Sequence, residues 1–360
     1  MRIISIANQK GGCGKTTTAI NLSDGLARRR KKVLLLDLDP QGHAAMGLGI
    51  DADSLEMTIH DVLGNAEGVK SALEEVIVRV NKNLDIVPSN LGLSTFEQNL
   101  SMRPGRENRL KEAIAGLWRF YDYIIIDCPP SLGLLTFNAL MASTEVFIPI
   151  EMGLFSLHGT SRLMGILDLI QEKTGQEIRV KVIATMFDRR TKIAKEVLRE
   201  IEDHFEGSMF ETVIDVSVKL KEAASYGKSI HDYAGKSKTG LDYMDLAKEV
   251  IAEEKIPGLV RKREGSVLQP DTGRMKFFIR APEARCVKVV GTFNDWSQSK
   301  NSLLKRHKNG VWSKEVRLSP GIYQYKFLID DTWAEDKSNP RVIEDSYGGR
   351  NSVIEVREGV

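Results

Sequence analysis

Short apolar runs alternate with longer helical segments over about the first 255 of the 360 residues. Several of the runs are apolar at every position, which is typical of strands covered on both faces in a parallel sheet. The pattern therefore predicts an α/β domain with a doubly wound, mostly parallel sheet. The predicted strands are residues 3–7, 32–37, 84–87, 123–127, 146–150 and 180–184.

The pattern changes after a stretch of turn-forming and charged residues at 257–273, which we interpret as a linker. Beyond it the runs are short and alternate between apolar and polar positions, as at 276–280, 286–290 and 323–327. Alternation with period two is typical of strands in antiparallel sheets. We predict one domain at 1–256 and a small antiparallel β-sandwich of the early-set, immunoglobulin-like kind at 274–360.

A glycine-rich loop lies between the first predicted strand and a helical segment at 16–30. Its glycines allow a tight turn that points backbone N–H groups inward, where they and the helix dipole can hold phosphate oxygens. Lysine at its end can reach the β- and γ-phosphates, and the two threonines can bind Mg²⁺ and the α-phosphate. The motif predicts a P-loop NTPase domain. Its residues are Lys10, Gly11, Gly12, Cys13, Gly14, Lys15, Thr16 and Thr17.

Three acidic residues end two of the predicted strands. Asp37 and Asp39 close the second strand, and Asp127 closes the strand at 123–127. Ligands of open parallel sheets gather at the carboxyl ends of the strands, so we expect these carboxylates to converge on the glycine-rich loop. Hard oxygen donors of this kind suit a phosphate-bound Mg²⁺.

The composition is that of ordinary globular protein, with 42% hydrophobic and 28% charged residues and a net charge of +2. The small net charge gives no overall positive potential of the kind that attracts nucleic acid, so DNA binding would need local patches of basic residues. Three cysteines and six histidines lack the spacing of a disulfide framework or a metal site. A secretion signal and an apolar stretch of about 20 residues are also missing, which predicts a cytoplasmic protein.

Residues 1 to about 255 resemble the ParA/MinD family of deviant phosphate-loop ATPases, and most of all its ParA (Soj-like) partitioning branch. The motifs that carry this resemblance are 10–17, 37–42, 123–133 and 245–250. It implies a homodimer that closes over ATP, with Lys10 reaching the partner's phosphates beside the catalytic Lys15. It further implies that Asp39 positions the attacking water, that Asp127 holds Mg²⁺ through water, and that Asp37 lies near the metal.

ParA relatives also bind DNA without sequence preference and work with a ParB-like activating partner, which implies an association with the nucleoid. The residues that match their DNA-binding regions are Arg189, Arg190, Lys192, Lys219 and Lys221, with Lys236 and Lys238 in a further region. Ordinary solvated cations are an equally good interpretation. The family's usual Pro-Arg-Asn is replaced here by residues 215–217, Asp-Val-Ser.

The tail resembles the glycogen-binding module of the AMP-activated protein kinase β subunit and family 48 carbohydrate-binding modules. By that resemblance Trp296 and Trp333 stack on glucose rings, Lys326 and Asn351 bind hydroxyls, and Tyr347 contacts the sugar chain. The family's threonine is replaced by Gly349. We expect Trp312 in the core. The alternative is a sandwich that serves as a protein-interaction module.

Two functions remain open on these grounds. The first is a ParA-type ATPase that positions a cargo, with DNA as its track and an α-glucan bound by the tail. The second is a nucleotide-switched regulator of carbohydrate metabolism that does not bind DNA. Membrane positioning in the manner of MinD is weaker, because the chain ends in the β-module rather than in an amphipathic basic helix.

Overall fold

The chain forms two separately packed units in the computed structural model, Met1–Arg261 and Lys262–Val360. The structure describes residues 1–64, 73–100, 103–153, 158–255, 274–307, 310–318, 321–336, 339, 341–345 and 349–356. The predicted linker at 257–273 lies outside the described residues, so the exact domain boundaries stay a prediction. Among the described residues, no helix combines the length and the apolar character that crossing a membrane requires.

A seven-stranded sheet organises the first unit, in the order β3-β4-β2-β5-β1-β6-β7. All neighbours are parallel except β3 and β4, so the predicted mostly parallel sheet is confirmed. Only the short antiparallel edge strand β3 was missing from the prediction. The strands are β1 (Arg2–Ile6), β2 (Val33–Asp37), β3 (Val78–Arg79), β4 (Leu84–Val87), β5 (Tyr123–Asp127), β6 (Glu145–Glu151) and β7 (Arg179–Thr185).

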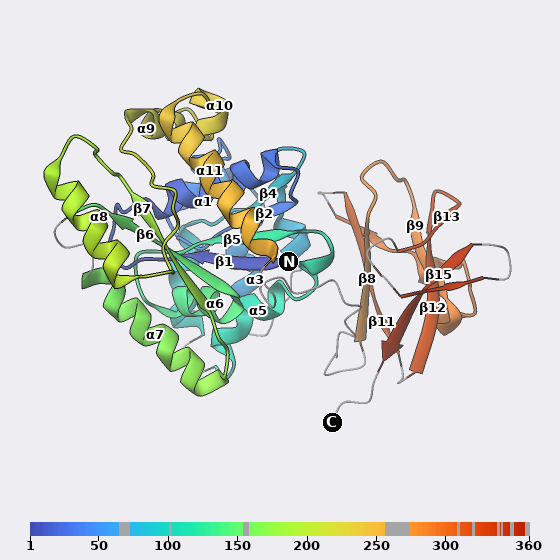
Figure 1. Ribbon diagram of the computed structural model, residues 1–360. Helices are drawn as coiled ribbons and strands as arrows, with labels where there is room; N and C mark the ends of the chain where they lie inside the picture. The colour runs from blue at the N-terminus through green and yellow to red at the C-terminus, as the bar shows by residue number, and fades with distance from the viewer. Residues whose placement is uncertain are drawn as a thin grey trace. The chain divides into compact units, whose positions relative to one another are not determined.

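Helices cover both faces of this sheet, as the continuously apolar strands require. One apolar core contains Ile4 and Ile6 of β1 and the helices α1 and α11, which Figure 1 shows side by side. The other contains Ile3 of β1 and packs against α6, α7 and α8. The helices are α1 (Lys15–Arg28), α2 (His43–Met46), α3 (Ile59–Leu63), α4 (Phe96–Asn99), α5 (Arg109–Ala113), α6 (Leu134–Ala142), α7 (His158–Thr174), α8 (Lys192–His204), α9 (Val218–Ser225), α10 (Ile230–Ala234) and α11 (Lys238–Ala252).

The strand register fixes where the functional residues meet. Ile6, the last residue of β1, lies opposite Asp127 of β5, and Asp127 lies opposite Asp37 of β2. All three strands end at this one edge of the sheet. The loop that follows β1 therefore starts beside both carboxylates, as the sequence predicted.

The second unit is all β. It has a three-stranded sheet, β10-β11-β8, and a five-stranded sheet, β13-β12-β15-β14, in which β9 also pairs with β12. Side chains of both sheets meet in one apolar core, which confirms the predicted β-sandwich. Trp312 is buried there, as expected. The strands are β8 (Arg274–Arg280), β9 (Val287–Gly291), β10 (Lys305–Arg306), β11 (Val311–Arg317), β12 (Gly321–Ile329), β13 (Thr332–Ala334), β14 (Val342–Glu344) and β15 (Arg350–Val356).

Candidate nucleotide and carbohydrate sites

The glycine-rich loop joins β1 to α1 in the conformation that its glycines allow. Gly12 has φ +75° and Gly14 has φ +90°, in the left-handed region that favours glycine. Gly14 precedes the first turn of α1, and its carbonyl accepts the backbone N–H of Thr18 at 2.8 Å. The first N–H groups of α1 have no partner within the helix, so they can bind an anion.

Two neighbouring strands hold this loop in place. The hydroxyl of Thr185, at the end of β7, donates to the carbonyl of Cys13 at 2.9 Å. Asn8 donates its side-chain amide to the carbonyl of Pro149 in β6 at 2.7 Å, and its carbonyl oxygen accepts the N–H of Lys10 at 3.0 Å. The loop is thereby preorganised by contacts from β6 and β7 and by a hydrogen bond within itself.

The two lysines of the loop have different surroundings. Lys15 is buried, and its Nζ donates to the backbone carbonyl of Lys10 at 3.1 Å. The Nζ of Lys10 lies 2.7 Å from a carboxylate oxygen of Glu151, with about a third of each side chain exposed (34% and 36%). Lys15 thus points into the loop, whereas Lys10 lies at its rim.

Asp37 is buried, and backbone N–H groups surround its carboxylate. One oxygen accepts from Asp39 at 3.0 Å, and the other accepts from Ala44 at 2.9 Å and Ala45 at 3.4 Å, at the start of α2. Burial raises the pKa of Asp37 to about 7, although these hydrogen bonds act in the opposite direction. The direct role of Asp37 in this structure is to fix the turn that carries Asp39.

Asp127 has the opposite environment. Its side chain is buried, yet neither carboxylate oxygen has a hydrogen-bond partner among the residues that the structure describes. Burial raises the pKa of Asp127 well above its usual range, and the Asp37 carboxylate raises it further, while the Thr16 hydroxyl and the Lys15 ammonium lower it. A buried carboxylate without a donor fits a site that is completed by a cation or by its bound water.

The donor set fits Mg²⁺ better than a transition metal. Within the described ranges, no group of three or more His, Cys, Asp and Glu could hold a metal ion by itself. Mg²⁺ keeps several waters and takes its other ligands from one or two protein oxygens and from phosphates. The Thr16 hydroxyl and Asp127 are the protein oxygens that meet this requirement here.

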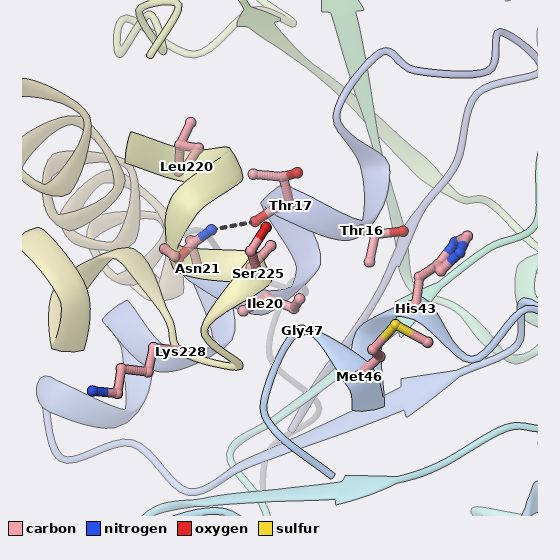
Figure 2. A pocket seen from close by; sticks show the side chains of 12 residues that line it. Thr16, Thr17, Ile20, Asn21, His43, Met46, Gly47, Leu220, Ser225 and Lys228 are labelled. Atoms are coloured by element: carbon pink, nitrogen blue, oxygen red, sulfur yellow. Dashed lines mark hydrogen bonds between the residues drawn. The ribbon is translucent and has the colours of Figure 1, made fainter. Parts of the chain in front are cut away.

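A pocket of about 400 Å³ adjoins the loop, and its lining comes from α1, α2 and α9. Figure 2 shows Thr16 and Thr17 on its α1 side, with the Asn21 amide donating to the carbonyl of Thr17 at 2.7 Å. The carbonyl oxygen of Asn21 accepts the N–H of Ile230 at 2.7 Å. Asn21 could not be found from the sequence, because an asparagine one turn beyond the motif carries no signal of its own.

Four of the five predicted sugar-binding residues lie within the described part of the tail. The rings of Trp296 and Trp333 are 6.3 Å apart and tilted by 59°, and Trp333 is 47% exposed. Asn351 donates its amide to the side-chain oxygen of Gln324 at 2.9 Å, and Lys326 forms an ion pair with Asp345. An exposed tryptophan near buried polar groups suits a sugar ring. Tyr347 lies outside the described residues.

Comparisons with known proteins agree with this geometry. Residues 1–180 match the family model described as an AAA domain. The sporulation initiation inhibitor protein Soj of Bacillus subtilis is 43% identical over 252 residues, which are 70% of this chain and 98% of Soj. The chain belongs to the ParA/MinD family of phosphate-loop ATPases.

Further relatives of this ParA/MinD-family chain include both partitioning proteins and enzymes. The chromosome partitioning protein ParA of Myxococcus xanthus is 42% identical, with 70% of this chain and 89% of that protein covered. Cobyrinic acid a,c-diamide synthase of Mycobacterium smegmatis, solved with an ATP analog and magnesium, has a TM-score of 0.63 at 31% identity, covering 72% and 98%. Membership of the family therefore does not by itself determine which cellular process this chain takes part in.

The tail matches a second family model, the glycogen recognition site of AMP-activated protein kinase, over residues 275–359. Soj and the Myxococcus ParA align with only about 70% of this chain. The chain thus joins a ParA/MinD-family ATPase domain to a module of the glycogen-recognition family.

The predicted DNA-binding residues of the ATPase domain fall into two groups. Arg189 pairs with Asp215 at 2.8 Å, and Arg190 pairs with Asp188 at 2.8 Å. Lys238 pairs with Asp242. Four others are exposed, and no described carboxylate pairs with them; they are Lys192, Lys219, Lys221 and Lys236. The structure thus leaves fewer cations available for phosphate than the sequence indicated.

Proposed function

We propose that this chain is a ParA-type ATPase that dimerises on ATP, hydrolyses it slowly and positions a cargo, while its tail binds α-glucan. The observation that supports it best is the buried, unpartnered carboxylate of Asp127 beside Thr16 and Lys15 at the mouth of the loop. Burying a charge without a partner costs stability, so such a group is expected where a ligand supplies the partner.

Each residue of the loop has a distinct task in this proposal. The N–H groups of the loop and of the first turn of α1 hold the β- and γ-phosphate oxygens. Lys15 leaves the Lys10 carbonyl and offsets the charge that develops on the phosphates in the transition state. Bound Mg²⁺ would be held by Thr16 and, through water, by Asp127, and it would neutralise phosphate charge.

Water activation falls to Asp39. Its backbone N–H is fixed by Asp37, and its own carboxylate accepts the N–H of Gln41 at 3.0 Å, so the side chain is held at the edge of the site. One oriented carboxylate can position a water in line with the terminal phosphate, as phosphoryl transfer requires. Lys10, at the rim, is the residue that we assign to the partner's ATP.

The central experiment measures ATP hydrolysis and dimerisation of Lys15→Ala. Removing the transition-state cation should lower kcat by about 10²-fold or more. Lys248→Ala is the matched control, because Lys248 is exposed and pairs with Asp245 of the same helix, α11, at 2.6 Å. Hydrolysis by Lys15→Ala at the wild-type rate would refute the proposed site.

The glucan part of the proposal rests on Trp296 and Trp333. Co-sedimentation of the full chain with an insoluble α-glucan should fall severalfold or more in Trp333→Ala, since stacking on the ring is lost. Tyr226→Ala removes an exposed aromatic side chain from the other unit and serves as the control. Retention that neither Trp296→Ala nor Trp333→Ala changes would exclude the proposed sugar site.

A second function is favoured by the ion pairs at Arg189 and Arg190, since cations that are already paired contribute less to phosphate binding. In it, the chain is a nucleotide-switched regulator of carbohydrate metabolism that does not use DNA, and its β-sandwich serves as a protein-interaction module. DNA retention of the ATP-loaded protein at low salt decides between the two. Retention that falls steeply with salt supports the DNA track, and its complete absence supports the regulator.

A further inference from the structure

A buried ion pair lies beneath a glycine in the tail. Lys326 of β12 pairs with Asp345, and the two side chains are only 13% and 12% exposed. Asp345 also accepts the backbone N–H of Gly349 at 2.9 Å, and its own N–H donates to the Gly349 carbonyl at 2.9 Å. The carboxylate is therefore fixed by backbone hydrogen bonds while it holds the ammonium group.

Gly349 lies against this ion pair. A Cβ at that position would lie 2.9 Å from the carboxylate oxygen of Asp345 and 3.1 Å from the Nζ of Lys326. The first distance is shorter than real Cβ contacts, so a side chain there would require the carboxylate of Asp345 to shift away from its present position. Gly349, Asp345 and Lys326 thus form one packed cluster.

The Lys326–Asp345 pair lies on the same face of the sheet as the candidate sugar site. Tyr325 and Phe327 point into the core, so Lys326, which lies between them on β12, points to the opposite face. Trp333 lies directly opposite Leu328, the next residue of β12 that shares the face of Lys326. An ammonium group on this face can give one N–H to Asp345 and two to sugar hydroxyls.

The pair changes what Lys326 can recognise. A lone, half-buried ammonium group attracts anionic ligands, whereas one that is already neutralised presents donors without a net charge. The nearby carboxylate also repels a phosphate group that approaches Lys326, since like charges placed together disfavour binding.

We propose that Asp345 is a specificity-determining residue that, together with Gly349, restricts this site to uncharged α-glucan and rejects phosphorylated glucan. This inference rests on the glucan binding proposed above. Asp345 acts through Lys326, and so it is a positioning residue rather than a sugar contact.

The test measures binding of the full chain to maltoheptaose and to maltoheptaose phosphate by calorimetry. Wild type should prefer the neutral sugar by about 10-fold, and Asp345→Asn, which removes the charge at nearly constant shape, should lose that preference. Glu315→Gln removes the same charge from the exposed face of β11 in the other sheet and should keep it. Thermal melting checks that each variant is folded.

Gly349→Ala provides a second, independent variant if Asp345→Asn does not fold. It should weaken neutral glucan binding and the preference together, because the added Cβ displaces the pair. Glucan binding that depends on Trp333, combined with an unchanged preference in both variants, would overturn this inference and leave the glucan proposal standing. No binding of either sugar by wild type would overturn both.

Discussion

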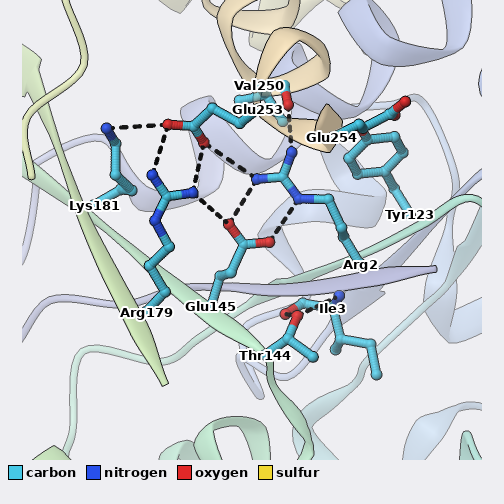
Figure 3. A network of polar contacts seen from close by, with 10 residues as sticks. All are labelled: Arg2, Ile3, Tyr123, Thr144, Glu145, Arg179, Lys181, Val250, Glu253 and Glu254. Atoms are coloured by element: carbon cyan, nitrogen blue, oxygen red, sulfur yellow. Dashed lines mark hydrogen bonds and ion pairs between the residues drawn. The ribbon is translucent and has the colours of Figure 1, made fainter. Parts of the chain in front are cut away.

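The two edges of the central sheet differ in whether their buried charges have partners. At the amino edge, where β1, β6 and β7 begin, every charge of the network in Figure 3 has a partner. Arg2 forms two hydrogen bonds of 2.6 Å with Glu145, although the two side chains are only 1% and 0% exposed. Glu253 binds Arg179 at 3.0 Å and Lys181 at 3.1 Å.

At the carboxyl edge, the carboxylate of Asp127 is buried without any hydrogen-bond donor among the described residues. Asp37, opposite it in the sheet, adds a second carboxylate, which accepts hydrogen bonds from backbone N–H groups. Charge is expensive in a protein interior unless it is paired. We infer that the paired charges of the amino edge stabilise the fold, whereas the unpaired carboxylate of the other edge is suited to bind a ligand.

The amino edge also anchors the end of the ATPase domain. Arg2 donates to the carbonyl of Val250 in α11, and Tyr123 donates to Glu254 directly after that helix. The network therefore joins the starts of four strands, β1, β5, β6 and β7, to the last helix before the predicted linker. Breaking it should loosen that helix as well as the sheet.

The largest expected effect comes from Glu145→Gln. The substitution keeps the shape but leaves the buried Arg2 guanidinium with only the Glu253 carboxylate as a counter-charge, 3.4 Å away and shared with Arg179 and Lys181. This should lower the free energy of unfolding by about 3–5 kcal/mol. Urea denaturation followed by far-UV circular dichroism measures the loss. Glu172→Gln, which removes a carboxylate from an exposed pair, is the control and should change little. A loss below about 1 kcal/mol would contradict the structural role of this network.

The matching substitution at the carboxyl edge should raise the free energy of unfolding instead of lowering it. Asp127→Asn removes an unpartnered buried charge, so the ligand-free protein should gain about 1–3 kcal/mol of stability. The same variant should lose Mg²⁺-dependent binding of ATP. Denaturation in the presence of a chelator measures the first effect, and nucleotide titration with and without Mg²⁺ measures the second.

The two raised carboxyl pKa values make the stability of the ligand-free protein depend on pH. The pKa of Asp127 is raised in the folded protein, and that of Asp37 is raised to about 7, so the folded state binds these protons more tightly than the unfolded chain. The stability of the ligand-free protein should consequently fall as the pH rises from about 4 through 7. Asp127→Asn should make this fall shallower, and an equally steep fall would contradict the assignment.

The functional residues of the carboxyl edge could be predicted from the sequence, whereas the charged network of the amino edge could not. The phosphate loop, Asp37 and Asp127 were found because glycine spacing and the ends of apolar runs identify them within the sequence itself. The amino-edge network was not found, because Arg2, Glu145 and Glu253 are distant in the chain and no spacing links them. Pairing at Arg189 and Lys326 was missed for the same reason, since each partner comes from another segment.

A smaller effect is expected at the exposed pair between Arg189 and Asp215, where a paired cation can be freed. Asp215→Asn should add one phosphate contact to a DNA-bound ATP form, which raises affinity severalfold and steepens the salt dependence by about 0.9 in log–log slope. DNA retention across a salt series measures both. Asp245→Asn, which frees Lys248 in α11, is the control. Equal retention by the two variants would show that Arg189 does not contact DNA.

The smallest effect concerns Lys10, whose pairing with Glu151 holds it within its own subunit. Glu151→Gln should free this lysine for the partner's phosphates and shift the ATP-dependent dimerisation constant by less than about fivefold, because an exposed ion pair contributes only about 0.2–1 kcal/mol. Analytical ultracentrifugation with a non-hydrolysable ATP analogue measures the shift, and Lys10→Ala should abolish it. If Glu151→Gln strengthened dimerisation equally in the Lys10→Ala background, its effect would not act through Lys10. The rim lysine would then resemble the paired charges of the amino edge, which serve the fold.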